Sequence, residues 1–163
     1  MKVRLWHCRG SAAYQERIRP QVQRILGMSP GVRTRVALAI AEAAKLLAGA
    51  EETELAIQLC CEAGDLRVVL RARCEHDAFP AQAAYRRFKW LGEEKRSAAE
   101  ALPRDPLLRS LWRMLLPAEY VVLEETGRKI ILLFQSPFAV DESDWNIGVL
   151  SERLLLERDA VAR

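Results

Sequence analysis

The sequence predicts an α+β protein, a two-layer α/β sandwich in which a mostly antiparallel sheet is covered on one face by helices. Apolar residues alternate or run unbroken in short segments, most of which form hairpin-like pairs, and helically spaced apolar residues occupy the segments between them. The 163 residues, 50% of them hydrophobic, suffice for one domain with a core and are too few for two ordinary domains. The expected order of elements is β-α-α-β-β-α-α-β-β-α.

The first predicted elements are a strand and a helix. Alternating apolar and basic residues indicate a short strand over residues 2–8. Apolar residues at helical spacing indicate a helix over residues 11–26. Ser11 is the expected N-cap of this helix, and Pro20 is expected to kink it.

The second predicted helix has the clearest start signal. Ser29 supplies a capping side chain, and Pro30 stands at the first helical position, where proline costs no hydrogen bond. The helix is rich in alanine and ends near Gly49. One side of it is apolar and should be buried: Val32, Val36, Ile40 or Ala39, Ala43 and Leu47.

Two hairpins are predicted. The first joins residues 54–61 to residues 66–72 through a turn that contains glycine. The second joins residues 119–124 to residues 129–135. Residues 130–134 are all apolar, which is typical of a strand in the middle of a sheet.

Three more helices are expected. One follows Pro80 and is interrupted at Gly92. The next is strongly amphipathic and lies between the capping residue Asp105 and Pro117. The last carries an apolar stripe of Ile147, Leu150, Leu154 and Leu155. The acidic tail with this leucine stripe could cover the basic N-terminal helices of its own chain or of a second copy.

These elements indicate one globular domain over residues 1–136 and a C-terminal helical extension, residues 137–163, which packs on the same domain or on a partner. No apolar stretch is long enough to span a membrane and the N-terminus has no hydrophobic signal region, so we expect a cytoplasmic protein without membrane contact. The four cysteines lack C-x-x-C spacing. We therefore expect reduced thiols. His7-Cys8 and Cys74-x-His76 could supply four metal ligands if their strands lay side by side, but neither pair has the usual finger or ribbon spacing, so we expect no metal site.

Charge is distributed unevenly along the chain. Residues 1–50 carry nine Lys and Arg against two Asp and Glu, a net charge of +7. Such a basic region suits an acidic protein or a nucleic acid, but no aromatic-interleaved basic run or recognised binding motif accompanies the charge, which disfavours nucleic acid. Trp145, a large aromatic in a polar context, is a further candidate contact because such residues often anchor interfaces. The full set of candidate partner-binding residues is Arg17, Arg24, Arg33, Arg35 and Trp145.

A resemblance to a known family rests on the element order and on two stretches, ILGMSP (25–30) and RTRVALAIAEAAK (33–45). They resemble the anti-sigma-factor serine kinases of bacterial partner-switching systems, which have the Bergerat, or histidine-kinase-like, ATPase fold. The resemblance covers about residues 11–135. It implies a Bergerat-like sandwich and a nucleotide site beside the second helix.

In that family, the second helix carries a glutamate that helps to activate the attacking group and, four residues later, an asparagine that holds the magnesium ion bridging the phosphates. Glu42 matches the glutamate, but Leu46 stands in place of the asparagine and offers no oxygen to a cation. Asn146 is the only asparagine in the chain and lies outside the matching region. Glu42 is therefore a candidate catalytic residue without the metal ligand that accompanies it. The alternative role for Glu42 is a helix-surface ion pair with Lys45.

The family's second motif, Asp-x-Gly-x-Gly, recognises adenine and lets the backbone approach the nucleotide. Residues 74–80 match its position, with Cys74 in place of the aspartate and with His76 and Ala78 in place of the glycines. Asp77 is a candidate nucleotide-binding residue, shifted along the chain from the motif aspartate. The family's glycine-rich lid has no counterpart, because no two glycines are separated by a single residue.

Three elements of one site are thus missing together, which favours a scaffold kept for binding without catalysis. We expect a bacterial signalling protein that binds an anti-sigma antagonist or a sigma factor, needs no cofactor and forms a homodimer. The main alternative is an atypical serine/threonine kinase that uses ATP, magnesium, Glu42 and Asp77. The second alternative is a basic nucleic-acid-binding module.

Overall fold

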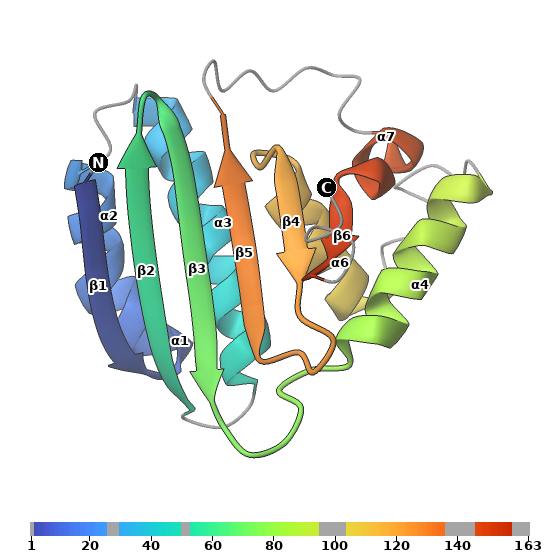
Figure 1. Cartoon of the computed structure of the whole chain (residues 1–163), viewed down its shortest axis with the longest axis horizontal. Helices are drawn as coiled ribbons and strands as arrows, with labels where there is room; N and C mark the ends of the chain where they lie inside the picture. Colours follow the sequence, from blue (N-terminus) through green and yellow to red (C-terminus); the bar gives the residue numbers. More distant parts are fainter. Residues whose placement is uncertain (1, 26–29, 50–52, 95–103, 136–145, 158–163) are drawn as a thin grey trace.

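The computed structural model describes residues 2–25, 30–49, 53–94, 104–135 and 146–157. They form one six-stranded sheet with strand order β1-β2-β3-β5-β4-β6 (Figure 1). All neighbouring strands are antiparallel except β4 and β6, which are parallel. The strands are β1 (Lys2–Arg9), β2 (Glu54–Glu62), β3 (Asp65–Arg73), β4 (Tyr120–Leu123), β5 (Lys129–Phe134) and β6 (Leu154–Leu156).

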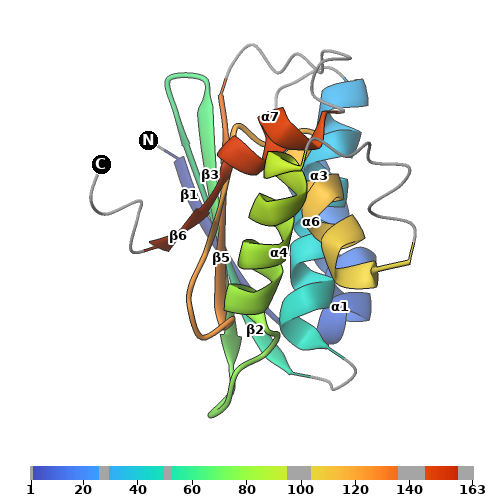
Figure 2. The same ribbon diagram turned by 90° about the vertical axis from the view of Figure 1, so that its right-hand side faces the viewer.

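The helices lie on one face of this sheet (Figure 2). They are α1 (Gly10–Ala13), a π-helical segment η1 (Tyr14–Ile18), α2 (Arg19–Ile25), α3 (Pro30–Ala48), α4 (Ala81–Glu93), α6 (Pro106–Leu115) and α7 (Ile147–Glu152). This arrangement confirms the predicted α+β class and the two-layer sandwich. No described helix is both long and apolar enough to cross a bilayer.

The main core lies between the sheet and the helices. Alternate strand residues point into it, as the hairpin patterns predict, and α3 packs over β2, β3 and β5. Its alanines are almost fully buried, so small side chains let this helix approach the sheet closely. A smaller apolar cluster lies on the opposite, open face of the sheet, at Val69, Val122, Ile131 and Leu155.

The first helical region differs from the predicted single helix. It begins at Gly10, after Arg9, with no side-chain cap, so Ser11 is not the N-cap. The wider π-helical turn of η1 ends two residues before Pro20. Proline has no N–H to donate to the carbonyl four residues earlier, and a local change in helical register accommodates that missing bond.

The C-terminal region also differs from its prediction. α7 ends at Glu152, and Leu154 and Leu155 belong to β6, not to a helix. These two leucines are buried in the sheet, while α7 packs on α4. The leucine stripe is therefore covered by its own chain, far from the basic N-terminal helices, and needs no second subunit for its burial (Figure 1). The predicted homodimer stays a prediction.

Two glycines allow close packing at the ends of elements. Gly92 is the penultimate residue of α4, which ends at Glu93, within one residue of the predicted interruption, and its missing side chain makes room for Ser151 of α7. Gly127, in the turn between β4 and β5, has a left-handed backbone (φ +70°). A β-carbon at Gly127 would overlap the carbonyl oxygen of Phe79.

We expect Gly127→Ala to lower the free energy of unfolding by about 2–4 kcal/mol, because alanine is strained at positive φ and its methyl group would also push Phe79 away. Gly49→Ala is the matched control: Gly49 has a similar φ of +60° but open space around it. That variant should lose only about 1–2 kcal/mol. Urea unfolding measures both, and equal losses would contradict the close contact at Phe79.

A second prediction concerns Tyr14, which is fully buried and donates a hydrogen bond to the carbonyl oxygen of Ala37 at 3.0 Å. Burial raises the pKa of the Tyr14 hydroxyl well above its usual range. Above pH ~10 the unfolded chain would ionise this tyrosine while the folded chain would not, so stability is full below that pH and falls as the pH rises further.

We expect the wild-type free energy of unfolding to fall above pH ~10 more steeply than that of Tyr14→Phe, by up to ~1.4 kcal/mol per pH unit. At pH 8 both chains are neutral at this position, and the variant should lose only about 0.5–1.5 kcal/mol for the missing hydrogen bond. Chemical unfolding across pH 8–11 measures both curves. Parallel curves would show that Tyr14 does not titrate differently in the two states.

Candidate functional site

The sequence places the candidate catalytic site on α3, on the side where Glu42 and Leu46 stand one helical turn apart. In the structure this side of α3 is packed against α6. α6 has a well-defined start: Asp105 accepts hydrogen bonds from the backbone N–H groups of Leu107 and Leu108 at 3.1 and 3.2 Å, and Pro106 follows the cap. The buried leucines of α6 join the main core, so this helix fixes what surrounds Glu42.

Both carboxylate oxygens of Glu42 face a cation. Oε2 lies 3.3 Å from Lys45 Nζ, an ion pair without a hydrogen bond, and Oε1 accepts a hydrogen bond from Arg113 Nη1 of α6 at 3.3 Å. The Glu42 side chain is 16% exposed, so these pairs are partly shielded from water. A general base needs an oxygen directed at its substrate. Here the carboxylate instead links α3 to α6 through Arg113. Within α3 it also forms the Lys45 pair that the sequence suggested.

Leu46 packs against the main core beside an open hollow of about 270 Å³ between α3 and α6. Three of the side chains that line the hollow are cationic: Lys45, Arg109 and Arg113. A divalent cation would be repelled by these charges, and position 46 supplies no oxygen to bind one. The side chains around Leu46 therefore disfavour the binding of magnesium.

The second candidate segment, residues 74–80, is fixed to the turn between β4 and β5. The Cys74 thiol donates to the carbonyl oxygen of His76 at 3.0 Å, and Arg128 donates to the carbonyl oxygen of Cys74 at 3.5 Å. Phe79 is buried under Gly127. Asp77 is exposed, and no residue of this segment lines the hollow beside Leu46. The structure thus does not bring Asp77 into that hollow with the α3 residues.

The four candidate partner-binding arginines lie on the N-terminal helices. Arg17 donates to the carbonyl oxygen of His7 at 3.4 Å, and Arg33 donates to the carbonyl oxygen of Gln23 at 3.3 Å. Arg24 and Arg35 are exposed. Trp145 lies outside the described residues. Two of the four arginines therefore have structural contacts within the described residues, and the other two are exposed.

The cysteines and histidines are dispersed. Strand β2 separates His7 and Cys8 on β1 from β3 and Cys74, and among the described residues no three His, Cys, Asp or Glu side chains gather closely enough to hold a metal. The thiols in the described part of the chain are free. Burial raises the pKa of the Cys8 and Cys61 thiols, although Arg17 partly opposes this shift at Cys8. These two thiols are poor nucleophiles as a result.

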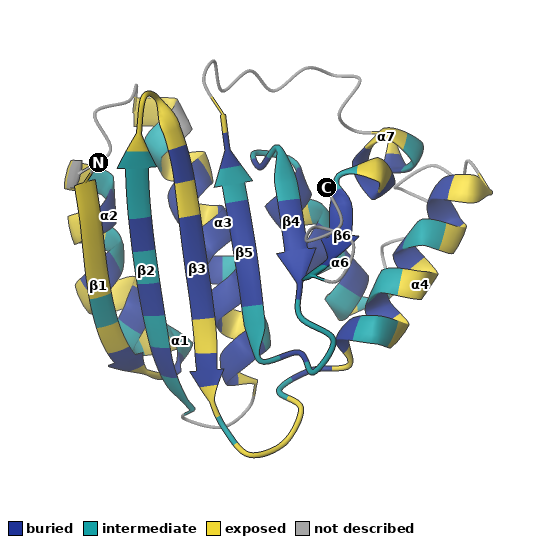
Figure 3. Ribbon diagram, in the orientation of Figure 1, coloured by how far each residue is buried: buried dark blue, intermediate teal, exposed yellow. Residues whose placement is uncertain are grey.

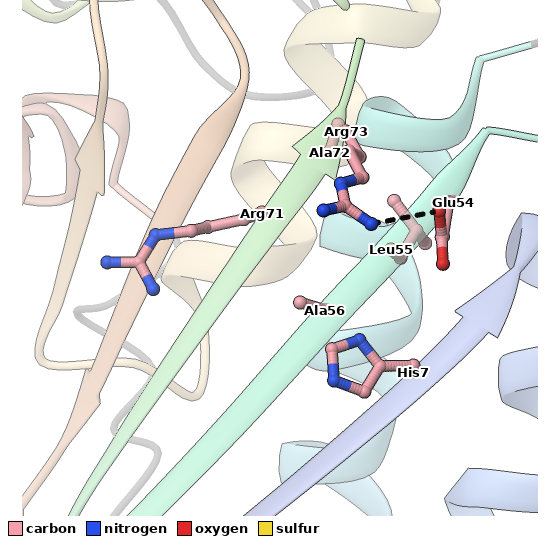
Figure 4. Close-up of a pocket in the computed structure, with 7 residues that line it drawn as sticks. All are labelled: His7, Glu54, Leu55, Ala56, Arg71, Ala72 and Arg73. Carbon is pink, nitrogen blue, oxygen red and sulfur yellow. Dashed lines mark ion pairs between the residues drawn. The ribbon is translucent and has the colours of Figure 1, made fainter.

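A second hollow, of about 320 Å³, lies on the open face of the sheet and was not predicted from the sequence (Figure 4). Its floor includes Ala56, which lies between His7 of β1 and Arg71 of β3 in the strand register. Arg73 and Glu54 form an ion pair of 3.7 Å at one side, but the Arg73 side chain is 84% exposed. A small residue between two large polar ones was the available signal, but it needs the register to be recognised. The hollow is lined by side chains of both charges.

No model of a known protein family and no curated protein matches this chain.

The ion pair that joins α3 to α6 can be measured with a double-mutant cycle of Glu42→Gln and Arg113→Met. We expect a coupling free energy of about 0.5–1.5 kcal/mol, because the carboxylate is mostly shielded while the guanidinium is about half exposed. Urea unfolding of the four proteins gives this value. A cycle with Arg71→Met, on the open face of the sheet, is the control and should give no coupling. Equal coupling in both cycles would contradict a specific contact.

Proposed function

We propose that this protein is a regulatory domain of the anti-sigma type that binds a protein partner through a degenerate histidine-kinase-like ATPase fold and does not hydrolyse ATP. The observation that carries the proposal is the pairing of Glu42 with Lys45 and Arg113 beside Leu46. At the place where a kinase of the resembling family would hold a metal and an activating carboxylate, this chain has an apolar residue and an occupied carboxylate.

Phosphoryl transfer depends on positioning and on neutralising the charge of the phosphates, usually through magnesium. Leu46 removes a metal ligand, and the cations that line the neighbouring hollow oppose a metal ion. Lys45 and Arg113 also neutralise the one candidate base. Restoring any single element would leave the others missing, which supports a binding role over a weakened catalytic one.

Two further observations support a protein partner. The element order of the structure from β1 to β5 is the order on which the resemblance to the anti-sigma kinases rests. The N-terminal helices also present exposed basic side chains, Arg24 and Arg35 among them, to an acidic surface. An anti-sigma antagonist or a sigma factor is the partner that the resemblance implies.

Titration calorimetry with Mg-ATP tests the loss of nucleotide chemistry. We expect no saturable binding up to about 1 mM nucleotide and no phosphate release, because the metal and the adenine both lack their ligands. Leu46→Asn is the matched variant, and it should stay inactive because the carboxylate is still paired. Micromolar binding, with transfer of phosphate that Glu42→Ala abolishes, would overturn the proposal in favour of the atypical kinase.

A second measurement tests the binding role itself. Affinity capture from the native bacterium with the wild-type protein, against an Arg24→Glu/Arg35→Glu control, should enrich a sigma factor or an anti-sigma antagonist only with the wild type. Recovery of nucleic acid instead, with affinity that falls steeply as salt is added, would favour the nucleic-acid alternative.

A further inference from the structure

Strand β1 is an edge of the sheet with eight residues in continuous register against β2. One hydrogen bond shows which residues of β1 bond to β2. The Gly10 N–H donates to the Thr53 carbonyl oxygen at 3.0 Å, so Gly10 and Thr53 are a hydrogen-bonded pair of the ladder. In an antiparallel ladder such pairs recur at every second residue, so the even-numbered residues of β1 bond to β2. The N–H and C=O groups of the odd-numbered residues point away from the sheet.

The hydrogen bond at His7 agrees with this alternation of inward and outward backbone groups. The carbonyl oxygen of His7 points outward and accepts a hydrogen bond from Arg17 of η1. Val3 and Leu5 precede His7 on the same side of the ladder, and their backbone groups also point outward. The edge therefore offers alternating donors and acceptors to an added strand, up to the residue where Arg17 covers it.

The side chains of β1 give this edge a pattern of its own. Most of β1 is exposed (Figure 3). Val3 and Leu5 are among the most exposed large apolar residues of the described chain, at 47% and 57%. They alternate with the side of β1 that carries the core-facing Cys8, so both lie on the open face of the sheet. Lys2 and Arg4 alternate with them, are exposed, and lie on the other face. An added strand would match this edge best if it carried apolar residues on the open face of the sheet and acidic residues on the other face.

The charge around the edge selects the same partner. Residues 2–25, from β1 to α2, contain six Lys and Arg and a single acidic residue, Glu16, a net charge of +5. A second copy of β1 would bring only further positive charge to this edge, since residues 2–9 contain no acidic side chain. The other sheet edge is unlike β1: β6 has three residues, and all of them are buried.

We infer that β1 is a docking edge for an extended segment of a partner protein in which acidic and apolar residues alternate, and that the segment joins the sheet as a seventh strand beside Val3 and Leu5. Main-chain hydrogen bonds supply the attachment, and the alternating side chains supply the selection. This inference deepens the proposed function by assigning the surface and the kind of segment that the partner contributes.

Amide hydrogen exchange followed by NMR gives the sharpest test. The probe is an eight-residue peptide that alternates Glu with Val, capped at both ends. Its addition should slow exchange at the Val3 and Leu5 amides at least tenfold, while the Arg4 and Trp6 amides, already bonded to β2, should change little. A peptide that alternates Lys with Val is the control and should give no protection. Protection elsewhere, or equal protection by both peptides, would overturn the inference.

Variants separate the backbone contribution from the charge contribution. Leu5→Pro removes an outward N–H without removing a bond to β2, a position where proline is tolerated in an edge strand. We expect it to raise the Kd of the Glu-Val peptide about tenfold, whereas Leu5→Val, which keeps the N–H, should change the Kd less than about twofold. Fluorescence anisotropy with a labelled peptide measures both.

Arg4→Glu should also weaken peptide binding severalfold, and the effect should shrink as salt is raised from about 50 to 300 mM. Arg71→Glu makes the same change in net charge on β3, two strands from the edge, and should have less effect. Equal effects would indicate attraction without strand addition.

Failure of this inference is distinguishable from failure of the proposed function. Concentration-dependent protection of the Val3 and Leu5 amides without peptide would show that a second copy occupies the edge, which overturns the assignment of an acidic partner segment. A captured protein partner that leaves these amides unprotected would overturn the docking edge and leave the regulatory proposal standing. Binding of Mg-ATP would overturn the regulatory proposal and leave the docking edge standing.

Discussion

The close packing of α3 against the sheet is the constraint on which the rest of this structure depends. Ala39 and Ala43 are fully buried, so the helix can lie close to β2, β3 and β5 without long side chains between them. Once that stripe faces the sheet, helical geometry places Glu42 and Leu46 on its flank, where α6 packs. The candidate catalytic position is thus oriented by alanines that take no part in chemistry.

The second consequence of that packing is electrostatic. With α6 seated on α3, Arg113 reaches Glu42 from across the helix interface, while Lys45 approaches from one turn along α3. A partly buried carboxylate with no counter-charge would be costly, so the Arg113 pair is part of what holds the two helices together. A site that must bind magnesium and phosphates would need the carboxylate and its neighbourhood free for ligands. The interface and a catalytic site therefore make opposite demands on the same few atoms.

The sequence predicted the elements whose patterns are local. The Ser29-Pro30 signal placed the start of α3, and alternating residues placed β1, β2 and β3 within one or two positions. Three consecutive leucines at 154–156 have no period that separates a strand from a helix, and only pairing with β4 decides the matter. Only one of the two partners of Glu42 could be predicted from the sequence: Lys45 is three residues away, but Arg113 is 71 residues along the chain. Contacts of that range depend on the packing of α6, which no local pattern specifies.

In β1, the alternation of even- and odd-numbered residues sets both the direction of the backbone hydrogen bonds and the burial of the side chains. Even-numbered residues bond to β2 and include Cys8, which faces the core, and Trp6, which packs against it. Odd-numbered residues carry the outward backbone groups and, at Val3 and Leu5, the exposed apolar side chains. A shift of the ladder by one residue would exchange the two sets, burying the apolar pair and exposing the core residues. The register of β1 against β2 therefore determines both the packing of β1 on the core and the exposure of Val3 and Leu5 at the edge. Any change of register that buried Val3 and Leu5 would also disrupt that packing.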